Sequence, residues 1–173
     1  MKLDYFYEIA LVIGLVLLQV LLLNRISLFG YATPILYSYF LLKLPMGRNV
    51  FYVIIVAFLM GLAIDIFLNT PGMNAAAITI VAAFQRNIRN SFFDRNEYYD
   101  EFVPSIHSTA GPFLWCAALV VSLHLTLLFF IESFTLFNLV NTLLRISSSI
   151  VLSFALIVAV DSLLFRPKKI SEQ

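Results

Sequence analysis

Residues 61–77 read GLAIDIFLNTPGMNAAA, and they place one carboxylate, Asp65, inside an apolar run. The run ends at Leu68, and a Pro-Gly pair separates it from a second apolar run that begins at Met73. Proline fixes φ and glycine permits a positive φ, so this pair is typical of a tight turn. The stretch therefore predicts a helical hairpin with an acid close to its turn.

The whole chain is too apolar for a water-soluble domain. Of its 173 residues, 61% are hydrophobic and 12% are charged, whereas soluble domains have about 45–50% apolar and about 25% charged residues. We therefore expect residues 1–173 to form a single domain in a lipid bilayer. The net charge of +1 gives no reason to expect a nucleic-acid partner. The lone cysteine, Cys116, lies in an apolar run, where it is expected to pack as a small hydrophobe.

Six apolar segments approach the roughly 20 residues that a membrane-crossing helix needs. They cover residues 5–23, 28–44, 50–68, 73–88, 111–131 and 146–165. The second and fourth are short, and one of them could be re-entrant. No small-residue cleavage site follows the first segment, so we expect it to stay as an anchor. The sixth is expected to begin as a helix near residue 137. The fold class is thus an all-α integral membrane protein with six transmembrane helices.

Lysine and arginine are distributed unevenly over the connecting loops, and membrane proteins concentrate them in cytoplasmic loops. With the N-terminus in the cytoplasm, nine basic residues lie inside and two, Arg25 and Arg145, lie outside. The nine are Lys2, Lys43, Arg48, Arg86, Arg89, Arg95, Arg166, Lys168 and Lys169. We therefore expect both termini and the loop of residues 89–110 to be cytoplasmic. Lys43 and Arg86 are expected to snorkel to the membrane surface.

The loop of residues 89–110 mixes charges with aromatic residues. The aromatic residues in and beside it are Phe92, Phe93, Tyr98, Tyr99 and Phe102. This composition fits an amphipathic element or docking surface at the membrane, and it fits equally well a connecting loop with interfacial aromatic residues.

The residues that could carry catalysis are few and scattered. Neither His107 nor His124 has a cysteine or carboxylate at metal-ligand spacing, and the sequence contains no nucleophile or phosphate-binding motif. We therefore expect no enzymatic activity, metal or cofactor. Within the apolar segments, His124 is expected to be a buried hydrogen-bonding group. Asp161 is expected near the inner membrane surface.

Asp65 needs a partner, because a charge at the middle of the bilayer costs at least about 2.5–3.5 kcal/mol. Gly61 lies four residues earlier on the same helical face and would let a neighbouring helix approach closely. Two arrangements would satisfy the carboxylate: an ion pair with Arg25 or Arg145, or capping of the helix that starts at Met73. Either arrangement could serve packing alone or also bind a partner or ligand on the outer side.

Three stretches resemble the rod shape-determining protein MreD family. They are LLQVLLLNRISLFG at residues 17–30, YATPILY at residues 31–37, and the stretch at residues 61–77. In that family a G-L-x-x-D pattern closes the third span, and a turn with proline and glycine leads into a run of small residues. The matching positions are Gly61, Leu62, Asp65, Pro71, Gly72 and Ala75. In many members a residue separates the proline and glycine that are adjacent here. The resemblance covers residues 19–83.

The resemblance implies a non-enzymatic scaffold of the bacterial cell-elongation complex, in the inner membrane, that controls rod shape and peptidoglycan synthesis. Its direct partner would be MreC, which would link it to MreB, RodA and a class B transpeptidase. The fold would be similar to the substrate-binding subunit of energy-coupling-factor transporters, and the alternative function is such a vitamin-binding subunit. The candidate residues for helix packing or partner binding are Asp65, Gly61, Pro71, Gly72, Asn74, Gln19, Asn24, Arg25, Pro34 and Arg145.

Overall fold

A computed structural model describes residues 2–25, 33–93, 102–132 and 139–164, and in these ranges the chain is helical without strands. The elements are α1 (Lys2–Leu21), the short 3-10 helix η1 (Leu23–Arg25), α2 (Tyr39–Lys43), α3 (Val50–Leu68), α4 (Met73–Phe92), α5 (Ala110–Glu132) and α6 (Leu139–Leu164). Among the described residues, α3, α5 and α6 are long and apolar enough to cross a membrane. This is the architecture expected of a multi-pass membrane protein.

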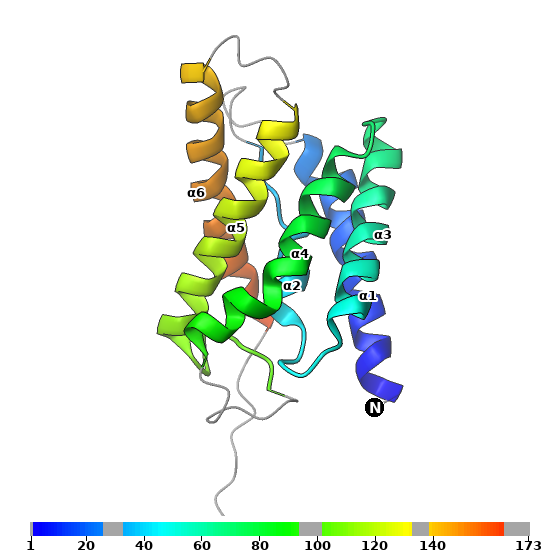
Figure 1. The fold of residues 1–173 in the computed structure, drawn as a ribbon, viewed down its shortest axis with the longest axis vertical. Helices are drawn as coiled ribbons and strands as arrows, with labels where there is room; N and C mark the ends of the chain where they lie inside the picture. Colours follow the sequence, from blue (N-terminus) through cyan, green and yellow to red (C-terminus); the bar gives the residue numbers. More distant parts are fainter. Residues whose placement is uncertain (1, 26–32, 94–101, 133–138, 165–173) are drawn as a thin grey trace, which may run out of the picture.

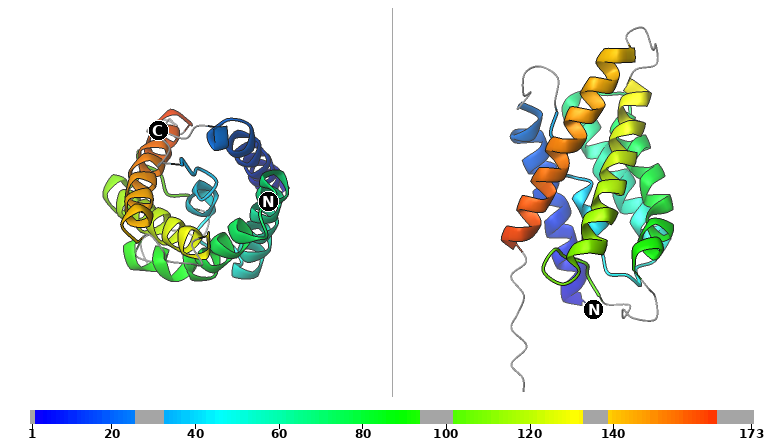
Figure 2. Two further views of the ribbon diagram at one scale, coloured as in Figure 1. Left: turned by 90° about the horizontal axis from the view of Figure 1, so that it is seen from above. Right: turned by 90° about the vertical axis from the view of Figure 1, so that its left-hand side faces the viewer.

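The five long helices stand side by side and form a ring, in the order α1, α3, α4, α5 and α6 (Figures 1 and 2). Each helix packs against the next one in this order, and the tightest packing joins α3 to α4. Within the described ranges, no comparable packing joins α1 to α6, which are the two ends of the ring. The segment of residues 33–44, which includes α2, runs through the middle of the ring (Figure 2).

This central segment corrects the prediction of one helix over residues 28–44. In its described part, residues 33–36 have no helical structure, and α2 is only five residues long. Every side chain from Ile35 to Leu44 is at most 6% exposed. The segment therefore belongs to the core of the bundle, and almost none of its surface is exposed.

The first anchor of the central segment is Gln19 on α1. Its amide nitrogen donates to the carbonyl of Pro34 at 3.0 Å, and its amide oxygen accepts from the backbone N–H of Leu36 at 2.9 Å. Non-helical backbone is tolerated at membrane depth only where protein surrounds and satisfies it. Gln19, which interrupts the first apolar run, supplies both of these bonds.

A second set of anchors comes from α6 and α4. Residues Ser149, Ser153, Ile157 and Asp161 are completely buried at intervals of four along α6, so they form one stripe that faces the central segment. The hydroxyl of Ser153 accepts from the N–H of Ile35 at 2.8 Å, and the amide of Gln85 on α4 donates to the carbonyl of Leu41 at 2.7 Å. Side chains of the ring thus replace the hydrogen bonds that a continuous helix would have made.

Helix α4 ends later than predicted, and helix α6 begins close to its predicted start. Helix α4 starts at Met73 as predicted, but it continues to Phe92, so the expected loop is shorter. Helix α6 starts at Leu139 and runs without interruption to Leu164, in line with a sixth helix that begins well before its apolar part.

Part of the expected loop packs against the bundle. The ring of Phe93 is 1% exposed and lies 6.5 Å, centroid to centroid, from the ring of the partly buried Phe102. Phe93 therefore belongs to the core, and Phe102 packs against it. Tyr98 and Tyr99 lie outside the described residues.

Candidate functional site

Asp65 caps the first turn of α4. One carboxylate oxygen accepts from the backbone N–H of Asn74 at 3.1 Å and the other from the N–H of Ala75 at 2.8 Å. The first backbone N–H groups of a helix have no partner within the helix, and the positive end of the helix dipole favours a carboxylate. The residue in the capping position, Gly72, has no side chain. Asp65 reaches across from α3 and supplies the cap instead.

Two further donors complete the surroundings of Asp65, which is only 2% exposed. The side-chain amide of Asn74 donates to it at 2.8 Å, and the hydroxyl of Thr70 also donates to it. Of the two arrangements expected for Asp65, the structure has the capping one. The side chain of Arg145 approaches Glu132 instead, at 3.5 Å, and the side chain of Arg25 lies outside the described residues.

Gly61 lies at the closest contact between α3 and α4. A Cβ atom at this position would be 2.5 Å from Cα of Ala75 and 2.9 Å from the carbonyl oxygen of Asn74. Both neighbours are backbone atoms, which cannot move aside without moving the helix. Glycine therefore lets the start of α4 come close enough for its N–H groups to reach Asp65.

The turn between α3 and α4 uses two left-handed residues. Asn69, with φ of 54°, ends α3, and Gly72, with φ of 81°, precedes the first residue of α4. Only glycine adopts this conformation without a steric penalty. Pro71 lies between them and is exposed. The adjacent Pro-Gly pair thus makes a compact turn, as the sequence indicated.

A chain of hydrogen bonds leads from Asp65 into the middle of the bundle. The amide oxygen of Asn74 accepts from the hydroxyl of Tyr37 at 2.8 Å, and the same hydroxyl lies 2.8 Å from Nε2 of His124. Since the Tyr37 hydrogen is used toward Asn74, Nε2 of His124 is the donor in the second bond. His124 is completely buried and bonded, as predicted, but its Nδ1 atom has no partner.

A small cavity of about 190 Å³ lies at the end of the bundle opposite the N-terminus. Its lining includes four of the residues named above as candidates for helix packing or partner binding, namely Gln19, Asn24, Asn74 and Arg145. Asn24 accepts a hydrogen bond from Gln19 at 2.9 Å. Ligand sites for drug-sized molecules usually measure about 300–1,000 Å³. This cavity therefore has room for a few water molecules or a very small solute.

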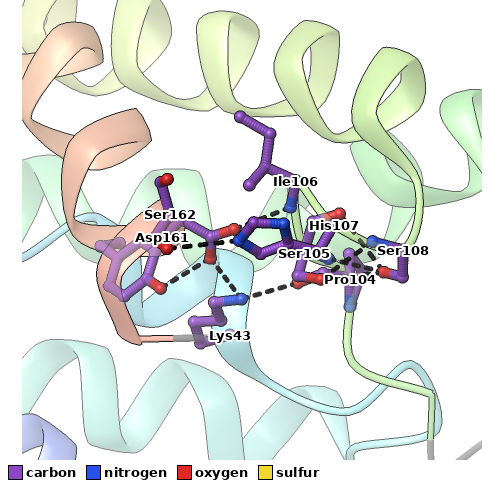
Figure 3. A network of polar contacts seen from close by, with 9 residues as sticks. Lys43, Pro104, Ser105, Ile106, His107, Ser108, Asp161 and Ser162 are labelled. Carbon is purple, nitrogen blue, oxygen red and sulfur yellow. Dashed lines mark hydrogen bonds and ion pairs between the residues drawn. The ribbon is translucent and has the colours of Figure 1, made fainter. Parts of the chain in front are cut away.

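A second buried carboxylate, Asp161, organises the opposite end of the bundle (Figure 3). It forms an ion pair with Lys43, accepts from the hydroxyl of Tyr39 at 2.7 Å and accepts from the backbone N–H of Ile106 at 2.7 Å. The ammonium of Lys43 also donates to the carbonyl of Pro104 at 3.0 Å. One carboxylate therefore connects α6, the central segment and the chain before α5.

The surroundings of Asp161 correct one expectation. Lys43 does not snorkel, because its side chain is 1% exposed and is paired with Asp161, whose carboxylate is completely buried. Lys43 and Asp161 carry opposite charges, and both lie at the same end of two predicted spans. These two features were all that the sequence offered to indicate the pair. The 117 residues between Lys43 and Asp161 carry no local pattern that would select this partner.

Arg89 at the end of α4 is a further buried cation, only 4% exposed. It was expected in a cytoplasmic loop. Its guanidinium lies 2.8 Å from the sulfur of Met46 and 3.5 Å from the carbonyl oxygen of Pro45. It thus fastens the turn that follows α2 to the end of α4.

Nine of the ten candidate residues divide into three groups, and the side chain of the tenth, Arg25, lies outside the described residues. Asp65, Gly61, Gly72 and Asn74 form one unit with the exposed Pro71 beside it; Gln19 and Pro34 hold the central segment; Asn24 and Arg145 line the small cavity. Within the described residues, no group of three histidine, cysteine or acidic side chains could hold a metal ion. No protein-family model, curated protein or solved structure matches this chain.

Proposed function

We propose that this chain is a membrane scaffold of the bacterial cell-elongation complex and that it binds MreC. The proposal starts from the resemblance of residues 19–83 to the MreD family. It rests on one observation above all: in the G-L-x-x-D stretch, both carboxylate oxygens of Asp65 accept hydrogen bonds from the first backbone N–H groups of α4. A carboxylate held in this way supports the assembly of helices and is poorly placed to react with a substrate.

The proposed topology has six crossings with both termini in the cytoplasm of the inner membrane. Five crossings are the long helices, and the second is the central segment, part extended and part α2. The basic side chains described at the N-terminal end of the bundle include Lys43, Arg48 and Arg89, which favours that end as the cytoplasmic one.

The vitamin-transporter alternative requires a roomy cavity with free polar groups on the outer side. The cavity at that end measures about 190 Å³, less than the usual size of a site for a drug-sized ligand. The polar groups deeper in the bundle, from Asn74 to His124, are mostly occupied by one another. Both observations favour the scaffold over the vitamin-binding subunit.

Co-purification tests the proposal. Tagged protein is extracted from bacterial membranes in a mild detergent, and the eluate is analysed for both proteins and released small molecules by mass spectrometry. The scaffold predicts that MreC is recovered in a fixed ratio to the tagged chain. Recovery of a vitamin in a fixed ratio, without MreC, would instead establish the transporter subunit.

A further inference from the structure

A long groove follows the open side of the helix ring, between α1 and the end of α6. It has a volume of about 1120 Å³. Leu11, Gly14 and Leu18 of α1 form one wall, Val160 and Leu164 of α6 form the other, and the central segment forms the floor. Because the neighbouring helices of the ring pack against each other everywhere else, this is the place where the core of the bundle meets its surroundings.

The length of the groove corresponds to one leaflet of a bilayer. Its wall on α1 extends from Tyr7 to Leu18, which is about 17 Å at 1.5 Å per residue. Half of the hydrocarbon core measures about 15 Å, and a crossing helix needs the full 30 Å or so. The groove therefore fits the acyl part of a lipid better than it fits a partner's membrane helix.

The groove is polar only at the end near the N-terminus of α1, where Glu8, Lys43 and Arg48 line it. Arg48 forms an ion pair with Glu8 through one amino group, and its guanidinium lies 4.2 Å above the ring of Tyr5. The side chain of Arg48 is 15% exposed, although its Nε atom is fully buried. An apolar trough that ends at a partly exposed guanidinium has the chemistry of a lipid site with a phosphate at its head.

The guanidinium of Arg48 keeps its positive charge in this position. Burial alone would lower the pKa of its guanidinium, but the hydrogen bond and the negative charge of Glu8 outweigh burial and raise the pKa. Because a guanidinium is planar and donates along more than one edge, Glu8 can occupy one edge while a phosphate oxygen accepts from another. A charge-assisted bond of this kind is among the stronger hydrogen bonds in proteins.

We propose that this groove binds one phospholipid from the leaflet on the N-terminal side, with its acyl chains along α1 and its phosphate at Arg48. The lipid fills the gap between α1 and α6 and completes the ring. The proposal is independent of the partner named above, because it concerns a different surface from the α3–α4 hairpin.

Gly14 offers a clean test, because a Cβ atom added there would meet no atom within 4 Å. Gly14→Phe fills the groove without disturbing the core, and Gly111→Phe is a matched control at another glycine with open space around it. The purified proteins are stripped of lipid in detergent, mixed with phosphatidylglycerol or with diacylglycerol of the same chains, and analysed by native mass spectrometry and thermal unfolding. Gly14→Leu replaces Gly14→Phe if the larger variant is poorly produced.

We expect the wild type and Gly111→Phe to retain one phosphatidylglycerol and to gain Tm from it. Gly14→Phe should bind it at least about tenfold more weakly. Diacylglycerol should bind the wild type more weakly than phosphatidylglycerol, and Arg48→Gln should remove that preference. Equal phosphatidylglycerol binding by Gly14→Phe and the wild type would overturn the proposal, as would equal binding of the two lipids by the wild type. A Gly14→Phe variant that keeps the lipid but loses MreC would show that the groove seats a partner helix instead.

Discussion

Asp65 and Asp161 are two buried carboxylates at opposite ends of the bundle, and they are satisfied in different ways. Asp65 is bound by neutral donors that all lie within ten residues of it along the chain. Asp161 is bound by a lysine, a phenol and a backbone N–H that come from two distant parts of the chain. The first site organises one hairpin, and the second ties three parts of the fold together.

The comparison shows that a charge inside a membrane protein can stabilise the fold locally or globally. When Asp65 is altered, its donors are still neutral groups that can be partly satisfied elsewhere. When Asp161 is removed, the buried ammonium of Lys43 loses this carboxylate. The two sites should therefore respond with different magnitudes to the same kind of substitution.

The largest effect is expected for Asp161→Ala, which breaks the buried ion pair with Lys43. Breaking a buried ion pair by removing one partner costs about 3–5 kcal/mol, and denaturant unfolding in detergent micelles would measure the loss. Adding Lys43→Met to Asp161→Ala should recover much of it, because no lone charge then remains. A single variant as stable as the wild type would contradict the role assigned to this pair.

Gly61→Leu should come next. Its Cβ would lie 2.5 Å from Cα of Ala75, and overpacking of this kind costs about 1–3 kcal/mol. The matched control is Gly111→Leu, where a Cβ also meets no atom within 4 Å and which lies outside the proposed lipid groove. Comparison of the two unfolding curves isolates the contact between α3 and α4. Equal stability of the two variants would mean that these helices are not in close contact.

Asp65→Asn should have a comparable or smaller effect. The new amide has only one acceptor oxygen and presents N–H groups toward donors, so at least one buried donor loses its bond, at about 1–3 kcal/mol. We also expect less MreC to be recovered with this variant from membranes. Glu132→Gln, at an acid that is half-exposed and weakly paired with Arg145, serves as the control and should change both measurements little. Wild-type behaviour of Asp65→Asn in both assays would remove Asp65 from the candidate residues.

The smallest effect is expected for Gly72→Ala in the turn. Gly72 has φ of 81°, and a residue with a Cβ atom is less stable in this conformation by about 1 kcal/mol. Thermal unfolding should show a small decrease in Tm. Gly111→Ala, at a glycine with ordinary backbone geometry, is the control, and a larger loss there than at Gly72 would rule out strain in the turn as the cause.

The sequence was most informative where the determinants are local. Residues 61–77 predicted the α3–α4 hairpin, its turn and the capping alternative for Asp65. The apolar runs, the carboxylate and the Pro-Gly pair that carry this prediction all lie within one short stretch. The same reasoning failed for residues 33–44, the described part of the helix predicted over residues 28–44. Their apolar composition is that of a helix, but their conformation depends on Gln19, Gln85 and Ser153, which lie far away in the sequence.

The long-range ion pair between Lys43 and Asp161 could not be predicted from the sequence either. Lys43 sits at the end of an apolar run, where a lysine usually snorkels, and only the arrangement of α6 beside α2 brings Asp161 to it. The groove between α1 and α6 could not be foreseen either, because it exists only where two helices of the ring fail to meet. Gly14 gave no signal of its own, since a single glycine in an apolar helix is common.

The central claim, that this chain is a scaffold for MreC, is tested most directly by the two purified proteins alone. The wild-type chain is reconstituted in phosphatidylglycerol nanodiscs, and its association with labelled full-length MreC is measured against nanodiscs that hold an unrelated membrane protein. The account predicts saturable binding at a fixed ratio, weakened by Asp65→Asn and unchanged by Glu132→Gln. Binding of MreC no stronger than to the control nanodiscs would contradict it.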